Sequence, residues 1–197
     1  MLRGRKVILR PYEEGFSDEE MAQLYRWSRD QEVLRWSGGS PVGLSLEEFK
    51  REFEQQQARP RTDRQVFAIL TADGELIGRI GYFDINPWKK QAELGIVIGA
   101  REYWNQGYGS DAVTTLLRHI FTTTDLERIY LFTYAENLRA QRSFAKCGFR
   151  PVGKAWKFSL QRGSHEEVEM EIWRWDFEPL LAKLKEGANE LHPQHRR

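Results

Sequence analysis

The sequence predicts an α/β fold, with one domain built on a mixed sheet and flanked by about four helices. Helix-like and strand-like apolar periods follow one another in the order β-α-α-β-β-β-α-β-α-β-β. The 197 residues are enough to bury one sizeable core. No repeat, low-complexity segment or linker divides them. We expect the domain to span residues 1–185 and a polar tail to occupy residues 186–197.

Composition narrows the class of protein. Hydrophobic residues make up 40% of the chain and charged residues 30%, as in ordinary globular proteins and unlike disordered ones. The formal net charge of +1 gives no reason to expect nucleic acid as a partner. The single cysteine, Cys147, suits a reducing cytoplasm, and no apolar run predicts a membrane span. The histidines are scattered, so no metal site is expected.

The N-terminal part reads as a strand followed by two helices. Residues 6–10 form a short strand that Pro11 ends. Helices are expected over about 17–29 and 45–58, because each begins with a capping-box pattern: Ser17 with Glu20, and Ser45 with Glu48. Residues 37–41 between the helices form a loop.

The middle of the chain changes to strand periodicity. Strands are expected over 65–70 and 76–85, joined by a hairpin turn at Asp73-Gly74, where glycine accepts a positive φ. A turn at residues 86–88 leads to a nearly continuous apolar strand over 92–98. Such a run is typical of a strand that is buried on both faces.

The last part alternates again and ends in a hairpin. A helix over 110–123, a strand over 128–134 and a helix from Asn137 to Lys146 are expected, with Gly148 as the left-handed residue after that helix. Strands over 152–160 and 167–175 then form a long hairpin that turns at residues 161–164.

The loop that opens the helix over 110–123 carries Gly107 and Gly109. The first N–H groups of a helix lack internal partners and carry partial positive charge, and glycines let the backbone approach an anion closely. Such a loop suits a pyrophosphate, although a tight strand-to-helix turn needs glycine as well. The spacing is neither G-x-G-x-x-G nor a Walker loop, which disfavours dehydrogenases and NTPases.

Two segments together carry a family resemblance. Trp104-Asn105-Gln106-Gly107-Tyr108-Gly109-Ser110 and the later Asn137-Leu138-Arg139-Ala140…Gly148-Phe149 resemble the GNAT superfamily of acyl-CoA-dependent N-acetyltransferases. The similarity covers about residues 7–175. Within the superfamily, the first segment is similar to ribosomal-protein N-terminal acetyltransferases. Asp84-Ile85-Asn86 followed by Ala92-Glu93-Leu94 is similar to spermidine N-acetyltransferases.

The resemblance implies a mostly antiparallel sheet that splays between two central parallel strands, with acetyl-CoA in the opening. It also implies which groups hold the cofactor. Backbone groups of the first strand would bind the pantetheine arm, and backbone N–H groups of the glycine loop would bind the pyrophosphate. Asn137 would contact the arm as well as cap its helix, and Arg142 is a phosphate candidate. The implied backbone sites are Ile96, Val97 and Ile98, then Gln106, Gly107, Tyr108, Gly109 and Ser110.

The implied reaction is direct attack of an amine on the thioester. Because most amines are protonated at neutral pH, a base must remove a proton. Glu93 is the first candidate and Asp84 the second. The family's acid, a tyrosine seven residues after the asparagine, is Phe144 here. The proton for the departing thiolate can then come from Ser143, Tyr134 or water, or the thiolate leaves without assistance. We expect Cys147 to be a buried structural thiol, not a nucleophile that forms an acyl-cysteine.

The acceptor remains open on sequence grounds. Protein N-termini, polyamines and other small amines are the candidates. A catalytically silent acyl-CoA-binding module is the alternative that Phe144 leaves open, although Glu93 and the intact glycine loop weigh against it. The last hairpin is compatible with a homodimer. Aromatic pocket candidates are Trp36, Tyr82, Trp88, Tyr134 and Trp156, and acidic candidates for a cationic acceptor are Glu13, Glu14 and Glu32.

Overall fold

A computed structural model describes residues 1–59, 61–159 and 162–179. Its strands form one eight-stranded sheet in the order β1-β2-β3-β4-β5-β6-β8-β7. The strands are β1 (Leu2–Arg3), β2 (Val7–Pro11), β3 (Gln65–Thr71), β4 (Leu76–Asn86), β5 (Gln91–Ile98), β6 (Arg128–Tyr134), β7 (Arg150–Ser159) and β8 (Gly163–Trp173). The helices are α1 (Asp18–Trp27), α2 (Gln31–Ser37), α3 (Leu46–Gln57), α4 (Tyr108–Thr123) and α5 (Leu138–Lys146), with 3₁₀ turns η1 (Tyr12–Glu14) and η2 (Arg101–Tyr103).

The sheet is antiparallel except between β5 and β6. These two strands pair in parallel from Gln91 with Arg128 to Glu93 with Tyr130, and the described pairing stops there. The rest of β5 keeps its pairing with β4 on the other side, while β6 pairs with β8 over its whole length. The predicted mixed sheet that splays at two central parallel strands is therefore confirmed.

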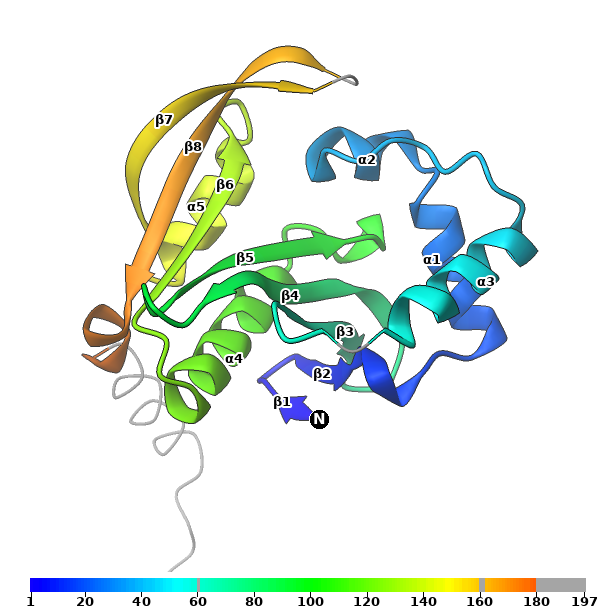
Figure 1. Ribbon diagram of the computed structural model, residues 1–197, viewed down its shortest axis with the longest axis horizontal. Helices are drawn as coiled ribbons and strands as arrows, with labels where there is room; N and C mark the ends of the chain where they lie inside the picture. The colour runs from blue at the N-terminus through cyan, green and yellow to red at the C-terminus, as the bar shows by residue number, and fades with distance from the viewer. Residues whose placement is uncertain (60, 160–161, 180–197) are drawn as a thin grey trace, which may run out of the picture.

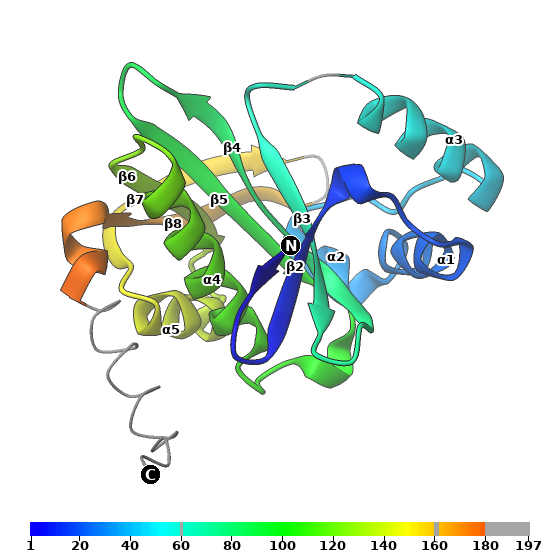
Figure 2. The ribbon, with the colours of Figure 1, turned by 90° about the horizontal axis from the view of Figure 1, so that it is seen from below.

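The larger core lies between the sheet and α4. The inward face of α4 includes Leu116, Leu117 and Ile120, and all three are fully buried against strand residues such as Ile69 and Ile129. Figure 2 shows α4 and α5 on the same side of the sheet. This packing fixes the N-terminus of α4 beside the end of β5.

The smaller core lies on the opposite face, under α1 and α3. Met21 and Leu24 of α1 pack with Tyr12 and with Ala68 and Leu70 of β3. Both helices begin with the expected capping boxes, in which Ser17 and Ser45 accept the backbone N–H groups of Glu20 and Glu48. The caps therefore set where each helix starts on this face.

The structure adds elements to those expected. α2 occupies residues between the expected helix over 17–29 and the expected loop over 37–41, with Asp30 accepting N–H groups at its start and Gly38 in the left-handed region at its end. β1 pairs with β2, and β8 begins earlier and ends earlier than the expected strand. The expected domain end at residue 185, the tail and part of the β7–β8 turn lie outside the described residues.

The β7–β8 hairpin extends from the sheet edge towards α2, as Figure 1 shows. Arg162 makes the contact: its guanidinium donates to the backbone oxygen of Arg35, 2.6 Å away, and to the carboxylate of Glu136. The hairpin and α2 therefore meet above the region where β5 and β6 diverge.

Candidate active site

A cleft of about 1180 Å³ occupies the divergence of β5 and β6. It continues from the N-terminus of α4 to the space beneath α2 and the β7–β8 hairpin. At the α4 end, where the sequence resemblance leads us to expect the cofactor (hence the cofactor end), its lining includes Ile96, Val97, Ile98, Trp104, Gly107, Gly109, Ser110, Asn137, Arg139, Arg142 and Ser143. At the opposite end, the lining includes Val33, Trp36, Arg64, Arg79, Phe83, Glu93, Phe132, Tyr134, Lys157, His165 and Glu167.

The loop before α4 has the backbone form that an anion site needs. Gly107 caps the helix with a φ of 85°, in the left-handed region, and Asn105 also has a positive φ of 61°. A Cβ at Gly109 would meet only ordinary contacts with Ile98 and Ile96. Gly107, Gly109 and Ser110 all line the cleft, so the N-terminus of α4 opens onto it, which suits a phosphate.

Trp104 fixes this loop to β5. Its indole Nε1 donates to the carbonyl of Ile98, 2.8 Å away, and the Arg139 guanidinium of α5 stacks on its ring. The general family pattern has arginine or glutamine where this chain has Trp104. The substituted residue thus connects the strand, the loop and α5 at the mouth of the cleft.

Asp111 anchors the same loop to the N-terminal strand region. Its carboxylate accepts the backbone N–H groups of Arg5, Lys6 and Val7 at 3.1, 2.7 and 3.1 Å. Lys6 Nζ in turn donates to the carbonyl of Gln106, 2.8 Å away. Sequence reasoning missed Asp111, and its place in the first turn of α4 was the only local signal.

Helix α5 supplies the other wall at the cofactor end. Asn137 is buried, and its side chain accepts the N–H of Ala140 at 3.1 Å, which confirms its capping role. Ser143 Oγ lies 2.8 Å from Ser110 Oγ, so the two hydroxyls form a pair. Arg142 is exposed and lines the cleft. Buried Cys147 contacts backbone oxygens of Ser110 and Ser143, and burial raises the pKa of its thiol.

Glu93 lies where β5 and β6 separate. Burial raises the pKa of this half-buried carboxyl above its ordinary value; Lys157 opposes the rise, and Asp84 and Glu167 add to it. Glu93 has no hydrogen bond or ion pair with another described residue, so its carboxylate is free to accept a proton. Asp84 is exposed, has a φ of 49°, and is not part of the cleft lining.

A charged group on β7 and β8 faces Glu93, and sequence reasoning missed it. Glu167 Oε2 lies 2.7 Å from Lys157 Nζ, in ion-pair contact without hydrogen-bond geometry. Glu167 Oε1 lies 3.3 Å from His165 Nε2. Lys157 is also placed over the Phe132 ring, 3.6 Å from its centroid. The β7–β8 hairpin therefore contributes Glu167 to the cleft as a carboxylate that is already paired with Lys157.

Tyr134 and Trp36 close the cleft beneath the hairpin. The guanidinium of Arg162 covers the Tyr134 ring at 3.9 Å and lies 5.8 Å from the Trp36 ring. Tyr134 also touches Gly38, where a Cβ would come within 2.8 Å of its hydroxyl. Burial raises the pKa of this hydroxyl, and Arg162 partly offsets the rise. Of the five aromatic residues expected in the pocket, Trp36 and Tyr134 thus line the cleft.

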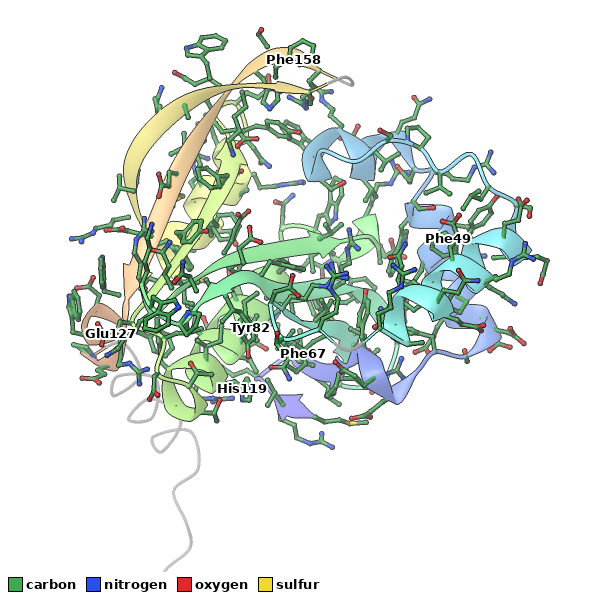
Figure 3. All side chains as sticks on the ribbon, viewed as in Figure 1. Phe49, Phe67, Tyr82, His119, Glu127 and Phe158 are labelled. Atoms are coloured by element: carbon green, nitrogen blue, oxygen red, sulfur yellow. The ribbon has the colours of Figure 1, made fainter. Side chains whose placement is uncertain are left out.

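Other expected site residues lie elsewhere. Tyr82 points into the core between the sheet and α4, near Phe67 in Figure 3, and its hydroxyl donates to Gln65. Trp88 is 94% exposed in the β4–β5 turn. Neither lines the cleft, because Tyr82 packs into the larger core and Trp88 lies in an exposed turn. The remaining expected residues that do not line it are Glu13, Glu14, Glu32, Asp84, Gln106, Tyr108 and Trp156.

No group of three or more His, Cys, Asp or Glu residues in the described part of the chain is arranged to hold a metal ion. Within the same residues, no helix is both long and apolar enough to cross a bilayer.

A sheet splayed beside a glycine-rich helix N-terminus defines the class of acyl-CoA-dependent acyltransferases. Residues 6–150 match the model of the acetyltransferase (GNAT) domain. The chain therefore belongs to the GNAT acetyltransferase family.

Individual relatives agree with this assignment. The chain is 29% identical over 103 residues to spermidine N(1)-acetyltransferase of Vibrio cholerae, across 52% of this chain and 59% of that protein, which is less than two thirds of its length. It is 25% identical over 154 residues to the Escherichia coli K12 enzyme of the same name, across 78% of each. A crystal structure of the Vibrio cholerae enzyme with CoA and spermine shares the fold, with a TM-score of 0.74, 21% identity, and coverage of 87% of this chain and 97% of that one.

Proposed function

We propose that this protein is an N-acetyltransferase that moves the acetyl group of acetyl-CoA directly to an amine of a protein N-terminus, a polyamine or another small molecule. The observation that carries the proposal is the end of β5–β6 pairing at Glu93 and Tyr130. Beyond it, the outer backbone edge of Ile96 to Ile98 faces the cleft, where a pantetheine arm can pair as an added strand does.

The cofactor end fits the rest of acetyl-CoA. The pyrophosphate would lie against the N–H groups from Gln106 to Ser110, at the positive end of α4. Arg139 and Arg142 on α5 line the same part of the cleft and would lie near phosphate groups. Asn137, already a helix cap, would contact the arm from the facing wall.

In the reaction, the nitrogen lone pair attacks the thioester carbonyl carbon, the C–S bond breaks, and the nitrogen loses a proton. Glu93 is the base for that proton, directly or through water, since its raised pKa suits proton exchange nearer neutrality. Asp84, which does not line the cleft, is the second candidate base and would accept the proton through water. Ser143 and Tyr134 both line the cleft and are the hydroxyls available to the departing thiolate, because Phe144 cannot donate.

Release of free CoA from acetyl-CoA, measured across spermidine, aminoglycosides and N-terminal peptides, tests the proposal. Amine-dependent release that Glu93→Gln abolishes supports the enzyme and its base together. Release that survives the mutation keeps the enzyme and moves the base elsewhere. Tight acetyl-CoA binding without release for any amine would replace the enzyme with a silent binding module.

A homodimer and a cytoplasmic setting belong to the same proposal. β7 is the last strand of the sheet, and Trp156 and Phe158 on it are 74% and 72% exposed; pairing of two β7 edges would cover them. Cys147 is a free thiol, as suits a reducing compartment. Sedimentation of the wild type against Trp156→Lys tests the dimer, since a monomeric wild type would exclude it.

A further inference from the structure

The half of the cleft beneath α2 carries more positive than negative charge. We call this part the acceptor half and define it by Val33, Trp36, Arg64, Arg79, Phe83, Glu93, Phe132, Tyr134, Lys157, His165 and Glu167. Lys157 and His165 are engaged with Glu167. Arg64 and Arg79 have no ion pair with any residue that the structure describes. Glu93 is thus the one unpaired acid of this set.

Strand pairing places the acid and the two arginines apart. Phe83 pairs with Glu93, and Arg79, four residues earlier on β4, pairs with Val97. Arg79 therefore lies about 13 Å along the sheet from the level of Glu93. Arg64 comes just before Gln65, which pairs with Tyr82, so it lies about two strand spacings, or ~10 Å, from Glu93.

The floor between Glu93 and the arginines consists of two glycines covered by the ring of Phe83. Gly81 and Gly95 pair across β4 and β5, and the ring of Phe83 lies over both: Cβ atoms there would come within 3.0 and 3.1 Å of it. An extended aliphatic chain can therefore lie on an apolar surface between Glu93 and the arginines. Arg79 also interacts with Tyr12, but a guanidinium has five N–H donors and retains some for a ligand.

This distribution is unsuited to an acceptor with several ammonium groups. With one amine at Glu93, a second ammonium at the far end would face Arg64 or Arg79, and like charges brought together oppose binding. A carboxylate or a phosphate at that end would instead receive charge-assisted hydrogen bonds from a guanidinium.

We propose that the preferred acceptor is a primary amine that carries an anionic group, a carboxylate or phosphate, several bonds away, with Arg64 and Arg79 as its specificity-determining residues. This inference rests on the N-acetyltransferase function proposed above. The amine is held at Glu93, the chain crosses the Phe83 ring, and the anion meets Arg79 or Arg64 according to the direction in which the chain extends.

Three six-carbon amines test the inference, because they differ only at the far end: 6-aminohexanoate is anionic, hexylamine is neutral, and 1,6-diaminohexane is cationic. We expect kcat/KM for CoA release to fall in that order, by about tenfold or more between the ends at low salt. Because 1,6-diaminohexane has two equivalent amino groups, its measured kcat/KM is divided by two before the comparison. 6-Aminohexyl phosphate, as a fourth substrate, distinguishes a phosphate preference from a carboxylate preference.

Arg64→Gln and Arg79→Gln should each narrow the ratio between 6-aminohexanoate and 1,6-diaminohexane while leaving hexylamine nearly unchanged. Arg51→Gln, on the exposed side of α3 and outside the cleft, should keep the wild-type ratio, and thermal unfolding verifies that all variants fold.

The other outcomes are separable. Preference for the diamine or for spermidine, equal rates for all three amines, or an equal loss for all three in the arginine variants would overturn the inference and leave the N-acetyltransferase intact. Release with none of the amines, nor with the peptides and aminoglycosides above, would overturn the proposed function itself.

Discussion

The guanidinium of Arg139 lies 4.2 Å from the ring centroid of Trp104, and this contact joins α5 to the loop that opens α4. Trp104 simultaneously donates to the carbonyl of Ile98. The strand, the loop and the helix that surround the cofactor end are thus held together by two side chains.

Truncating either partner should weaken cofactor binding. Trp104→Ala and Arg139→Ala each remove a cation–π contact of about 0.5–2 kcal/mol, so we expect KM for acetyl-CoA to rise about threefold to thirtyfold. Trp104→Phe keeps a ring for Arg139 but loses the bond to Ile98, and should give an intermediate value. The double alanine variant should cost less than the sum of the singles; strict additivity would show that the two residues act separately.

The two loop glycines should respond differently to alanine. Gly107→Ala places a Cβ at a φ of 85°, where a non-glycine residue costs about 1–2 kcal/mol, so the melting temperature should fall. Gly109→Ala meets only ordinary contacts within the protein and should leave stability unchanged while raising KM for acetyl-CoA about tenfold or more. An unchanged KM for acetyl-CoA in Gly109→Ala would contradict the proposal that this loop binds the pyrophosphate.

The pH dependence of kcat/KM should report Glu93. Burial raises its pKa, so the acidic limb of the profile should have its midpoint above the ordinary glutamate value. Lys157 lowers that pKa, and Lys157→Met should therefore shift the limb to higher pH. Glu93→Gln should reduce kcat by about 10²–10⁴-fold and flatten the limb; a limb that persists in this variant would belong to another group.

Asp111 should matter for stability. Asp111→Ala removes the acceptor of three backbone N–H groups, and at about 0.5–1.5 kcal/mol for each bond we expect a loss of about 2–4 kcal/mol. Urea unfolding measures it. Asp125→Ala, an exposed aspartate outside this site, is the control and should remain within about 0.5 kcal/mol of wild type. Equal effects of the two variants would contradict the anchoring role.

Local features of the fold were predictable because their causes are local. The capping boxes at Ser17 and Ser45 and the left-handed Gly148 depend on neighbouring residues alone. α2 escaped prediction because seven residues give too short an apolar period, although Asp30 and Gly38 marked its ends. The strand 92–98 was expected to be buried on both faces, but the divergence leaves its second half only partly covered.

The left-handed Gly107 before α4 and the Asn137 cap of α5 were predictable for the same reason, whereas the contacts within the acceptor half were not. Glu167 and Lys157 meet through β7–β8 pairing, in which Lys157 is opposite His165, and periodicity does not give a register between strands. Tyr82 was assigned to the pocket although it faces the core. The pairing of β4 shifts register twice, at residues 76–78 opposite Ile69 and Leu70 of β3 and at residues 83–86 opposite β5. Counting alternate residues from either end of β4 therefore does not give the face on which Tyr82 lies.

If acetyl-CoA pairs with β5 as proposed, the divergence of β5 and β6 also makes the stability of the protein depend on the concentration of acetyl-CoA. An unpaired strand edge inside a molecule is a place where local opening starts, and a cofactor that pairs with it binds the native chain alone. By mass action, a ligand at about a hundred times its Kd adds about 2.7 kcal/mol to the free energy of unfolding. The lifetime of this protein in a cell would then follow its acetyl-CoA supply.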